Sequence, residues 1–334
     1  MHEIRFCRND ELILLQDFLA KHWSKNHVLV SSSKLLLWQH FNSENKTINF
    51  VVAFNKKKKE FDAILGFIPS SQFDKKLRKK DIWLAIWKVK EEFASTGIGL
   101  QVLLFLTNKY KPSSIGISGA SEDAMKIYRA FGYKTGVLRH FYIKNDSLDN
   151  YKIAKFDKFK NFYLPANSSV KIKKISAEEF LNANISYQYS PLKTKKYFIN
   201  RYMKNPFYDY IFNSIQINKK IVSVFIARKI IVNNNSCFRI VDWIGEYQKN
   251  MYFQFQDLLE INSAEYIDLI CKTPNDKEII KMGFLEKNSN LEVIPNFFEP
   301  FLKKNIDLLY AYKAKHQNYA FFKADSDQDR PNMI

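Results

Sequence analysis

Two glycines, Gly97 and Gly99, lie between a predicted strand and a predicted helix in the sequence A-S-T-G-I-G-L. A glycine turn at this point exposes backbone N–H groups at the positive end of the helix, and proteins commonly bind phosphate groups there. Tyr128 follows on a second predicted helix, four residues before Gly132. A tyrosine hydroxyl can donate a proton to a leaving group. The stretch therefore predicts phosphate binding, with a proton donor further along the chain.

The elements that position these residues follow the order strand, turn, helix, strand, helix between Asp81 and Tyr133. Residues 82–89 are apolar on both faces, as expected of a central strand. Residues 98–106 are apolar almost all round, which predicts a helix buried against a sheet. A second strand is predicted at 115–118, and a capped helix is predicted from 121 to 132.

This order of elements and motifs resembles the GNAT superfamily of acyltransferases. The pyrophosphate loop of that family reads Q/R-x-x-G-x-G/A, and a later helix carries a tyrosine four residues before G-F or G-Y. This chain has A-S-T-G-I-G at 94–99 and Y-R-A-F-G-Y at 128–133. Ala94 departs from the Gln or Arg of the family. The resemblance covers residues 1 to about 145 in element order.

The resemblance implies a site for acyl-CoA, with acetyl-CoA or 3-hydroxybutyryl-CoA as the co-substrate and no metal. Tyr128 would protonate the departing CoA thiolate, since a phenol with a pKa of about 10 is a reasonable donor to a thiolate of similar pKa. Strand N–H groups near residues 88–90 would stabilise the oxyanion. The cofactor-binding residues implied are Val89, Thr96, Gly97, Ile98, Gly99 and Leu100.

The segments H-W-S-K-N-H-V-L and L-W-Q-H-F supply the expected acceptor side. They resemble the acceptor helix and loop of two-domain sugar N-acyltransferases that act on dTDP-3-amino-3,6-dideoxyhexoses. The resemblance implies that His27 is a general base or a substrate contact, with Trp38 and Gln39 beside it. The alternative is that His27 is structural, as most single histidines are.

The second half of the chain repeats the pattern of the first in a weaker form. Its motif N-D-K-E-I-I-K-M-G-F matches Y-R-A-F-G-Y, but Ile279 stands where the first half has Tyr128. Only Gly245 and Gly283 follow Gly136, so no second glycine turn exists. The halves are either similar by chance or copies of one unit, the second of which has lost cofactor binding.

The predicted fold class is α/β with a mixed sheet: a tandem GNAT fold with a degenerate second domain. We expect an acyl-CoA-binding domain at 1–145 and a substrate domain at 170–334. The polar, irregular segment 146–169, which contains Pro165, is the predicted linker.

The C-terminal sequence A-D-S-D-Q-D-R-P-N is unlike a simple disordered tail. Asp325, Asp327 and Asp329 alternate, so an extended chain would point all three to one side. They could bind the ammonium or hydroxyl groups of a sugar while Arg330 faces phosphate. The alternatives are a frayed terminus and a metal site; the latter is disfavoured because no calcium-loop glycine is present.

The charge balance favours an anionic partner: 52 Lys and Arg stand against 34 Asp and Glu, for a net charge of +18. The basic residues are scattered, which argues against nucleic acid. Three widely spaced cysteines suit a reducing compartment, and neither a signal peptide nor an apolar run of about 18 residues is present. We expect a cytoplasmic protein with no membrane partner, and the sequence is compatible with a homodimer.

The resulting hypothesis is an N-acyltransferase that moves an acyl group from CoA to a nucleotide-linked amino sugar, as in O-antigen and lipopolysaccharide biosynthesis. One rival is an aminoacyl-tRNA-dependent tandem-GNAT transferase, which would use the positive charge. Another is a non-catalytic GNAT-like binding protein, which Ala94 leaves open.

Overall fold

The structure is a computed structural model that describes residues 2–77, 80–157, 169–297, 301–315 and 318–331. Its contacts divide the chain into two compact units. Unit 1 comprises residues 1–135, 310–315 and 330–334, and unit 2 comprises residues 136–309 and 316–329. Residues 158–168, which include Pro165 of the predicted linker, lie outside the described residues.

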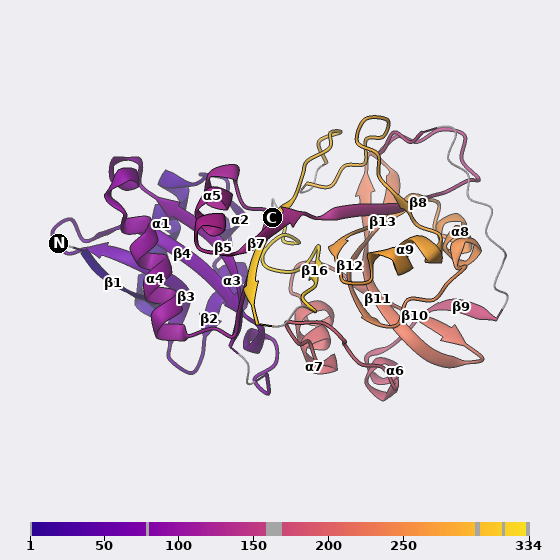
Figure 1. Ribbon diagram of the computed structural model, residues 1–334, viewed down its shortest axis with the longest axis horizontal. Coiled ribbons are helices and arrows are strands. Elements are labelled where there is room, and N and C mark those ends of the chain that lie inside the picture. Colours follow the sequence, from indigo (N-terminus) through magenta and orange to yellow (C-terminus); the bar gives the residue numbers. More distant parts are fainter. Residues whose placement is uncertain (1, 78–79, 158–168, 298–300, 316–317, 332–334) are drawn as a thin grey trace. The chain divides into compact units, whose positions relative to one another are not determined.

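Unit 1 is built on a mixed sheet with the strand order β1-β3-β4-β5-β6-β15-β7, and β2 pairs with β3 (Figure 1). Strands β5 and β6 are parallel, as in a strand–helix–strand crossover, while β1, β3, β4 and β5 pair antiparallel. The strands are β1 (His2–Arg8), β2 (Phe41–Asn42), β3 (Thr47–Asn55), β4 (Glu60–Pro69), β5 (Asp81–Val89), β6 (Ser114–Ser118), β7 (Lys134–Val137) and β15 (Leu309–Ala314).

The apolar helix predicted behind the glycine turn is α4, which packs against β1, β3, β4 and β5. The capped helix is α5, and the Ser121 hydroxyl accepts a hydrogen bond from the Ala124 N–H (3.3 Å) at its start. The helices are α1 (Leu12–His22), α2 (Val28–Ser31), α3 (Ser33–His40), α4 (Ile98–Tyr110) and α5 (Glu122–Ala130), with short helices η1 (Asn9–Glu11), η2 (Ser70–Gln72) and η3 (Glu91–Thr96).

Unit 2 has a sheet with the strand order β14-β8-β13-β12-β11-β10-β9, and β16 pairs with β13. Here β12 and β13 are the parallel pair. The strands are β8 (Arg139–Lys144), β9 (Val170–Lys174), β10 (Ile211–Ile217), β11 (Lys220–Val232), β12 (Asn235–Gly245), β13 (Ala264–Lys272), β14 (Leu285–Glu286) and β16 (Phe321–Phe322). The helices are α6 (Ala177–Asn182), α7 (Lys195–Phe198), η4 (Ile199–Met203), α8 (Tyr252–Ile261) and α9 (Asp276–Met282).

The two sheets match strand by strand when the second is read from β9 to β14. The parallel pair occupies the same place in both, so the prediction of a repeated fold is confirmed. One strand is exchanged between the sheets: β15 from the end of the chain pairs with β6, and β8 from the first half pairs with β13. The units therefore differ from the linear division at 146–169, because each sheet contains a strand from the other half of the sequence.

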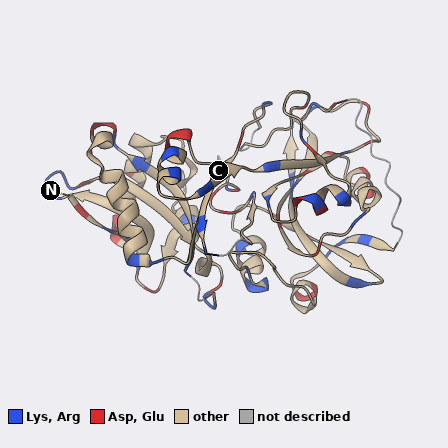
Figure 2. Cartoon of the chain, viewed as in Figure 1, with Lys and Arg blue, Asp and Glu red and all other residues tan. Residues whose placement is uncertain are grey.

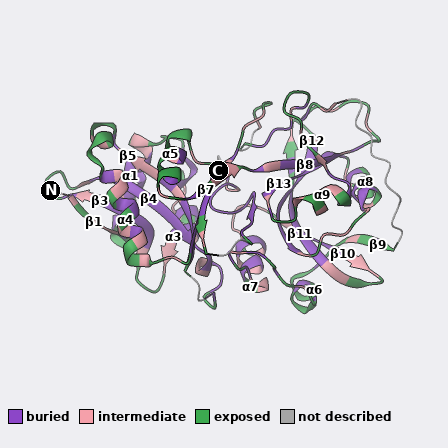
Figure 3. Ribbon diagram, viewed as in Figure 1, coloured by how far each residue is buried: buried purple, intermediate pink, exposed green. Residues whose placement is uncertain are grey.

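The central strands of both sheets are mostly buried, and the exposed residues lie on helices, on loops and on strands such as β7 and β9 (Figure 3). Lysine and arginine residues are distributed over the elements of both units with acidic residues among them (Figure 2). Among the described residues, no helix is both long and apolar enough to span a membrane.

Candidate active site

A wedge opens in the sheet of unit 1 where the two parallel strands separate. The last pair between β5 and β6 is Leu84↔Ile117. Strand β5 continues to Val89, and no described strand pairs with this extension on its β6 side. We call the space beside residues 85–89 of β5 the first wedge. Backbone groups on that edge of β5 are available to a ligand.

The predicted glycine turn lies at the start of α4. Gly97 has φ +77°, a left-handed conformation that glycine adopts without strain, and it caps the helix. The N–H groups of Ile98, Gly99 and Leu100 donate to no described residue, so the helix start presents three unpaired donors. The Thr96 hydroxyl donates to the Phe93 carbonyl (2.7 Å) and stabilises the turn itself.

Gly99 allows α4 to approach β5 closely. A Cβ at this position would lie 2.8 Å from Cγ2 of Val89 and 3.6 Å from Nε1 of Trp87. The first distance is shorter than side chains tolerate, so any larger residue would push the turn away from the strand. The turn and the wedge thus form one continuous surface, on which the predicted cofactor residue Val89 lies beside Gly99.

Tyr128 is buried on α5, and its ring lies 5.8 Å from Trp87 and 5.2 Å from Tyr133 between centroids. Its hydroxyl makes no hydrogen bond to a described residue. Burial raises the pKa of Tyr128, and the neighbouring Tyr133 raises it further. The phenol therefore carries its proton at neutral pH, and burial makes it a weaker acid than a free phenol, whose pKa is close to that of a thiolate. Trp87 lies beside both the Tyr128 ring and the glycine turn, although its sequence pattern marked it only as part of a strand.

His27 caps α2, where its Nδ1 accepts a hydrogen bond from the Leu29 N–H (3.3 Å). Its Nε2 lies 2.7 Å from Nη2 of Arg330. A guanidinium has only donors, so a hydrogen bond in this pair needs Nε2 as the acceptor, whereas the Leu29 contact needs Nδ1 as the acceptor. A neutral imidazole carries one N–H and accepts at only one of its two nitrogens. The general-base role and the substrate-contact role of His27 both stay predictions.

Trp38 and Gln39 both lie on α3. The Trp38 ring packs against Phe73 with centroids 5.3 Å apart, and the Trp38 carbonyl accepts from Gln72 (3.1 Å). Gln39 is buried, with 3% of its surface exposed. None of the described contacts brings these two residues together with Tyr128, and their substrate role stays a prediction.

The aspartates of the C-terminal segment are engaged within unit 2. Asp325 is fully buried, accepts the Phe322 N–H (2.9 Å) and forms an ion pair with Lys193 (2.8 Å). Asp329 binds Arg228 (2.7 Å) and the Tyr210 hydroxyl (2.7 Å). Asp327 accepts from the Gln328 amide (3.1 Å).

The expectation of an extended chain at these aspartates is wrong. The chain turns between β16 and Arg330, and Ser326 has φ +61°. The segment is a folded part of unit 2 up to Asp329, and Arg330 belongs to unit 1. The substrate role of the three aspartates stays a prediction.

Unit 2 has a second wedge, which its own chain fills. The last pair between β12 and β13 is Ile240↔Leu269, and β12 continues to Gly245. Strand β16 pairs with β13 at Cys271 and Lys272, and the Ala324 N–H donates to the Val241 carbonyl (3.1 Å). The C-terminal segment therefore occupies the edge of β12 that corresponds to the open edge of β5.

A buried ion cluster holds this segment in the second wedge. Lys193 contacts both Asp242 (2.8 Å) and Asp325 (2.8 Å), and Tyr202 donates to Asp242 (2.6 Å). All four side chains are buried. Removing one member would leave charge poorly compensated in the interior, which is costly.

Comparison with solved structures identifies the fold. The chain resembles a GCN5-related N-acetyltransferase from Kribbella flavida (TM-score 0.56, 9% identity) over 94% of this chain and 72% of the other. It resembles another from Anabaena variabilis (TM-score 0.55, 13% identity) with the same coverage. This chain has the fold of the GCN5-related N-acetyltransferases. No protein-family model and no curated protein matches its sequence.

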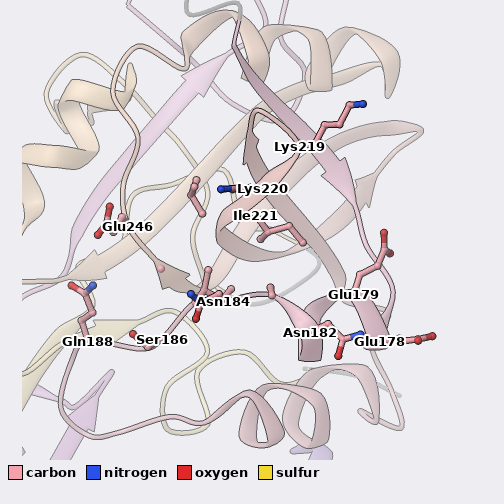
Figure 4. A pocket seen from close by; sticks show the side chains of 14 residues that line it. Glu178, Glu179, Asn182, Asn184, Ser186, Gln188, Lys219, Lys220, Ile221 and Glu246 are labelled. Atoms are coloured by element: carbon pink, nitrogen blue, oxygen red, sulfur yellow. The ribbon is translucent and has the colours of Figure 1, made fainter.

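Within this GCN5-related fold, unit 2 also carries a cavity of about 720 Å³ that the sequence analysis did not predict (Figure 4). It lies between α6, the β10–β11 turn and the end of β12. Carboxylates, amides and two lysines line it, so it offers both donors and acceptors. They are Glu178, Glu179, Asn182, Asn184, Gln188, Lys219, Lys220 and Glu246. No sequence motif marked this set, because its members come from three separate elements.

In the described part of the GCN5-related fold, no three His, Cys, Asp or Glu side chains are grouped as a metal site requires. The three cysteines are buried and unpaired with one another.

Proposed function

We propose that the chain is an acyl-CoA-dependent N-acyltransferase and that unit 1 binds the acyl-CoA. The observation that carries this proposal is the continuity of the glycine turn with the first wedge. Three unpaired N–H groups at the start of α4 suit the pyrophosphate, and the unpaired edge of β5 suits the amides of the pantetheine arm. The GCN5-related fold of N-acetyltransferases supports the same assignment.

In the proposed reaction, the amine of the acceptor attacks the thioester carbonyl, forming a C–N bond. The C–S bond then breaks, and Tyr128 gives its proton to the departing thiolate while the amine loses a proton to solvent. The N–H of Lys90 already donates to the Asp62 carbonyl on β4 (2.9 Å). Because successive N–H groups of a strand point to opposite edges, the N–H of Val89 faces the first wedge. Among residues 88–90, Val89 is therefore the oxyanion donor.

The acceptor in this proposal is a nucleotide-linked amino sugar of the dTDP-3-amino-3,6-dideoxyhexose type, and the acyl group is acetyl or 3-hydroxybutyryl. The resemblance of the segments around His27 and Trp38 to sugar N-acyltransferases supports it. So does Arg330, which places a guanidinium beside His27, where a phosphate of the nucleotide could bind. The net charge of +18 also favours an anionic acceptor.

A coupled assay tests the proposal. The protein is mixed with acetyl-CoA or 3-hydroxybutyryl-CoA, a panel of dTDP-amino sugars and a thiol reagent that reports free CoA. We expect acceptor-dependent CoA release with at least one pair. Absence of release above background with every pair, while CoA binds, would contradict the sugar acceptor. If calorimetry shows no CoA binding, the proposal of an acyl-CoA-dependent enzyme is contradicted.

The charge of the chain also favours a second candidate, transfer from aminoacyl-tRNA. That function requires RNA binding that weakens steeply with salt. Filter binding of tRNA at 50 and 200 mM salt distinguishes the two, because an acyl-CoA enzyme acting on small acceptors needs no such complex.

A further inference from the structure

Trp87 lies in the first wedge but has no role in the function proposed so far. It is three residues beyond Leu84, the last β5 residue that pairs with β6, and it pairs with Leu65 of β4 on the other edge. Its indole Nε1 is buried and hydrogen-bonds to no described residue. An indole nitrogen is a donor only, and leaving such a donor unpaired in the interior destabilises the fold.

The surroundings of this nitrogen belong to the proposed site. Nε1 lies 3.6 Å from the point where a Cβ on Gly99 would stand, so it is next to the glycine turn. The indole ring is also the neighbour of Tyr128, whose hydroxyl has no partner among the described residues. Two side-chain donors therefore lie in one region without an acceptor from the protein. A ligand with carbonyl oxygens would supply one.

Unit 2 contains a tryptophan in the corresponding place, Trp243. It too lies three residues beyond the last parallel pair, and it pairs with Phe225 as Trp87 pairs with Leu65. Its ring stacks on Phe225 (5.5 Å between centroids) and is also contacted by Tyr247 (5.0 Å). Its Nε1 is also buried without a described partner. A missing partner alone is therefore no sign of a ligand.

The two positions differ in what lies around them. Trp243 is fully buried in a wedge that the C-terminal segment fills. Trp87 is only partly buried, the glycine turn and the Tyr128 ring lie beside it, and no described strand pairs with its side of β5. We propose that the indole N–H of Trp87 donates a hydrogen bond to an amide carbonyl oxygen of the pantetheine arm. This inference rests on the proposed function and adds a binding residue to it.

The test is the substitution Trp87→Phe, which keeps an aromatic ring beside Tyr128 and removes the donor. Calorimetry is performed with CoA and with adenosine 3′,5′-bisphosphate, which lacks the pantetheine arm. We expect CoA to bind about tenfold more weakly, as for the loss of one hydrogen bond, and the bisphosphate to bind unchanged. The melting temperature of the unliganded protein should stay the same or rise, because an unpaired donor has been removed. Trp243→Phe is the matched control and should change neither affinity.

Equal CoA affinity for wild type and Trp87→Phe would overturn the inference, and so would an equal loss for CoA and the bisphosphate, which would show a structural effect on the turn. If wild type binds no CoA, the proposed function fails instead. A second measurement needs only the native protein: the indole ¹⁵N–¹H spectrum should show one of the five tryptophan signals shift with CoA and not with the bisphosphate. A spectrum in which CoA and the bisphosphate shift the same signals would also contradict it.

Discussion

The two wedges of this protein are built alike and filled differently. In unit 1 the strands part after Leu84 and Ile117, and no described segment pairs with the free edge of β5. In unit 2 the strands part after Ile240 and Leu269, and the C-terminal segment hydrogen-bonds to the free edge of β12. A strand edge in a separated pair needs a hydrogen-bonding partner. Unit 2 obtains that partner from its own chain, whereas in unit 1 no described strand supplies one, and we propose that a ligand does.

The helices that follow the wedges show the same contrast. α4 begins at a left-handed glycine with three unpaired N–H groups, whereas α8 begins after Met251, which is not a glycine. Tyr128 on α5 corresponds to the fully buried Ile279 on α9. The turn, the hydroxyl and the open edge thus occur together in unit 1, and unit 2 has none of the three at the corresponding places. This contrast supports the proposal that acyl-CoA binds to unit 1.

The largest effect is expected at the glycine turn. Gly99→Glu places a side chain where even a Cβ lies 2.8 Å from Val89, and it adds negative charge at the phosphate site. CoA affinity should fall by at least a hundredfold (about 3 kcal/mol), and turnover should be lost. Calorimetry and the thiol assay measure both. The control is Phe253→Glu at the second position of α8, an exposed residue, which should leave CoA binding intact. Comparable losses in both variants would show that the two helix starts are equivalent after all.

The next effect is on the stability of unit 2. Asp325→Ala leaves Lys193 with one carboxylate instead of two and removes the acceptor of the Phe322 N–H. We expect the free energy of unfolding to fall by about 3 kcal/mol. CoA affinity should not change, because the C-terminal segment fills the second wedge and we propose that CoA binds at the first. Glu178→Ala, at an exposed carboxylate of the same unit, is the control for stability. An altered CoA affinity in Asp325→Ala would contradict the proposal that CoA binding depends on unit 1 alone.

Tyr128→Phe should lower kcat by about a hundredfold, the lower end of what general acid catalysis contributes, and leave the Kd for CoA within twofold. Stopped thiol assays and calorimetry separate the two quantities. Tyr133→Phe, in the neighbouring ring, should be close to wild type. If the Tyr133 variant loses kcat and the Tyr128 variant does not, the proton donor has been assigned to the wrong ring.

The smallest effect concerns pH. Burial opposes ionisation of Asp329, but the Arg228 charge and hydrogen bonds from Arg228 and Tyr210 lower its pKa overall. A carboxylate whose pKa is lower in the folded state stabilises the fold above its unfolded pKa of about 3.9 and loses that effect as pH falls. Wild type should therefore unfold at higher urea than Asp329→Asn at pH 7, and the difference should close below about pH 4. A constant difference would show that the charge of Asp329 is not the cause.

Local patterns in the sequence predicted much of unit 1. The strand at 82–89, the glycine turn and the helix that carries Tyr128 are adjacent in the chain, and turn chemistry and apolar spacing are local signals. The repeated sheet of unit 2 was also predictable, because the second half repeats the motif of the first, with Ile279 at the place that matches Tyr128.

The exchanged strands could not be predicted in this way. β15 pairs with β6 across nearly 200 residues of chain, and short apolar strands carry no mark of a distant partner. The predicted extended conformation of the C-terminal segment was wrong for a related reason. Its alternating aspartates predicted an extended, ligand-facing chain, but Asp325 and Asp329 bind Lys193 and Arg228 instead. The sequence placed Trp87 on a strand but gave it no role in the site. Only the structure shows that its Nε1 lies beside Gly99, which distinguishes Trp87 from other core aromatics.

The exchange of β8 and β15 has a consequence for how the protein is made. During synthesis on a ribosome, β6 is complete long before its partner β15 at Leu309–Ala314 has been translated. The outer edge of β6 therefore stays exposed until β15 emerges near the end of the chain. In the same way, β8 has no partner until β13 has been translated. A product truncated before residue 309 lacks a strand in the sheet that holds the glycine turn. Premature termination anywhere before β15 thus leaves the first sheet incomplete.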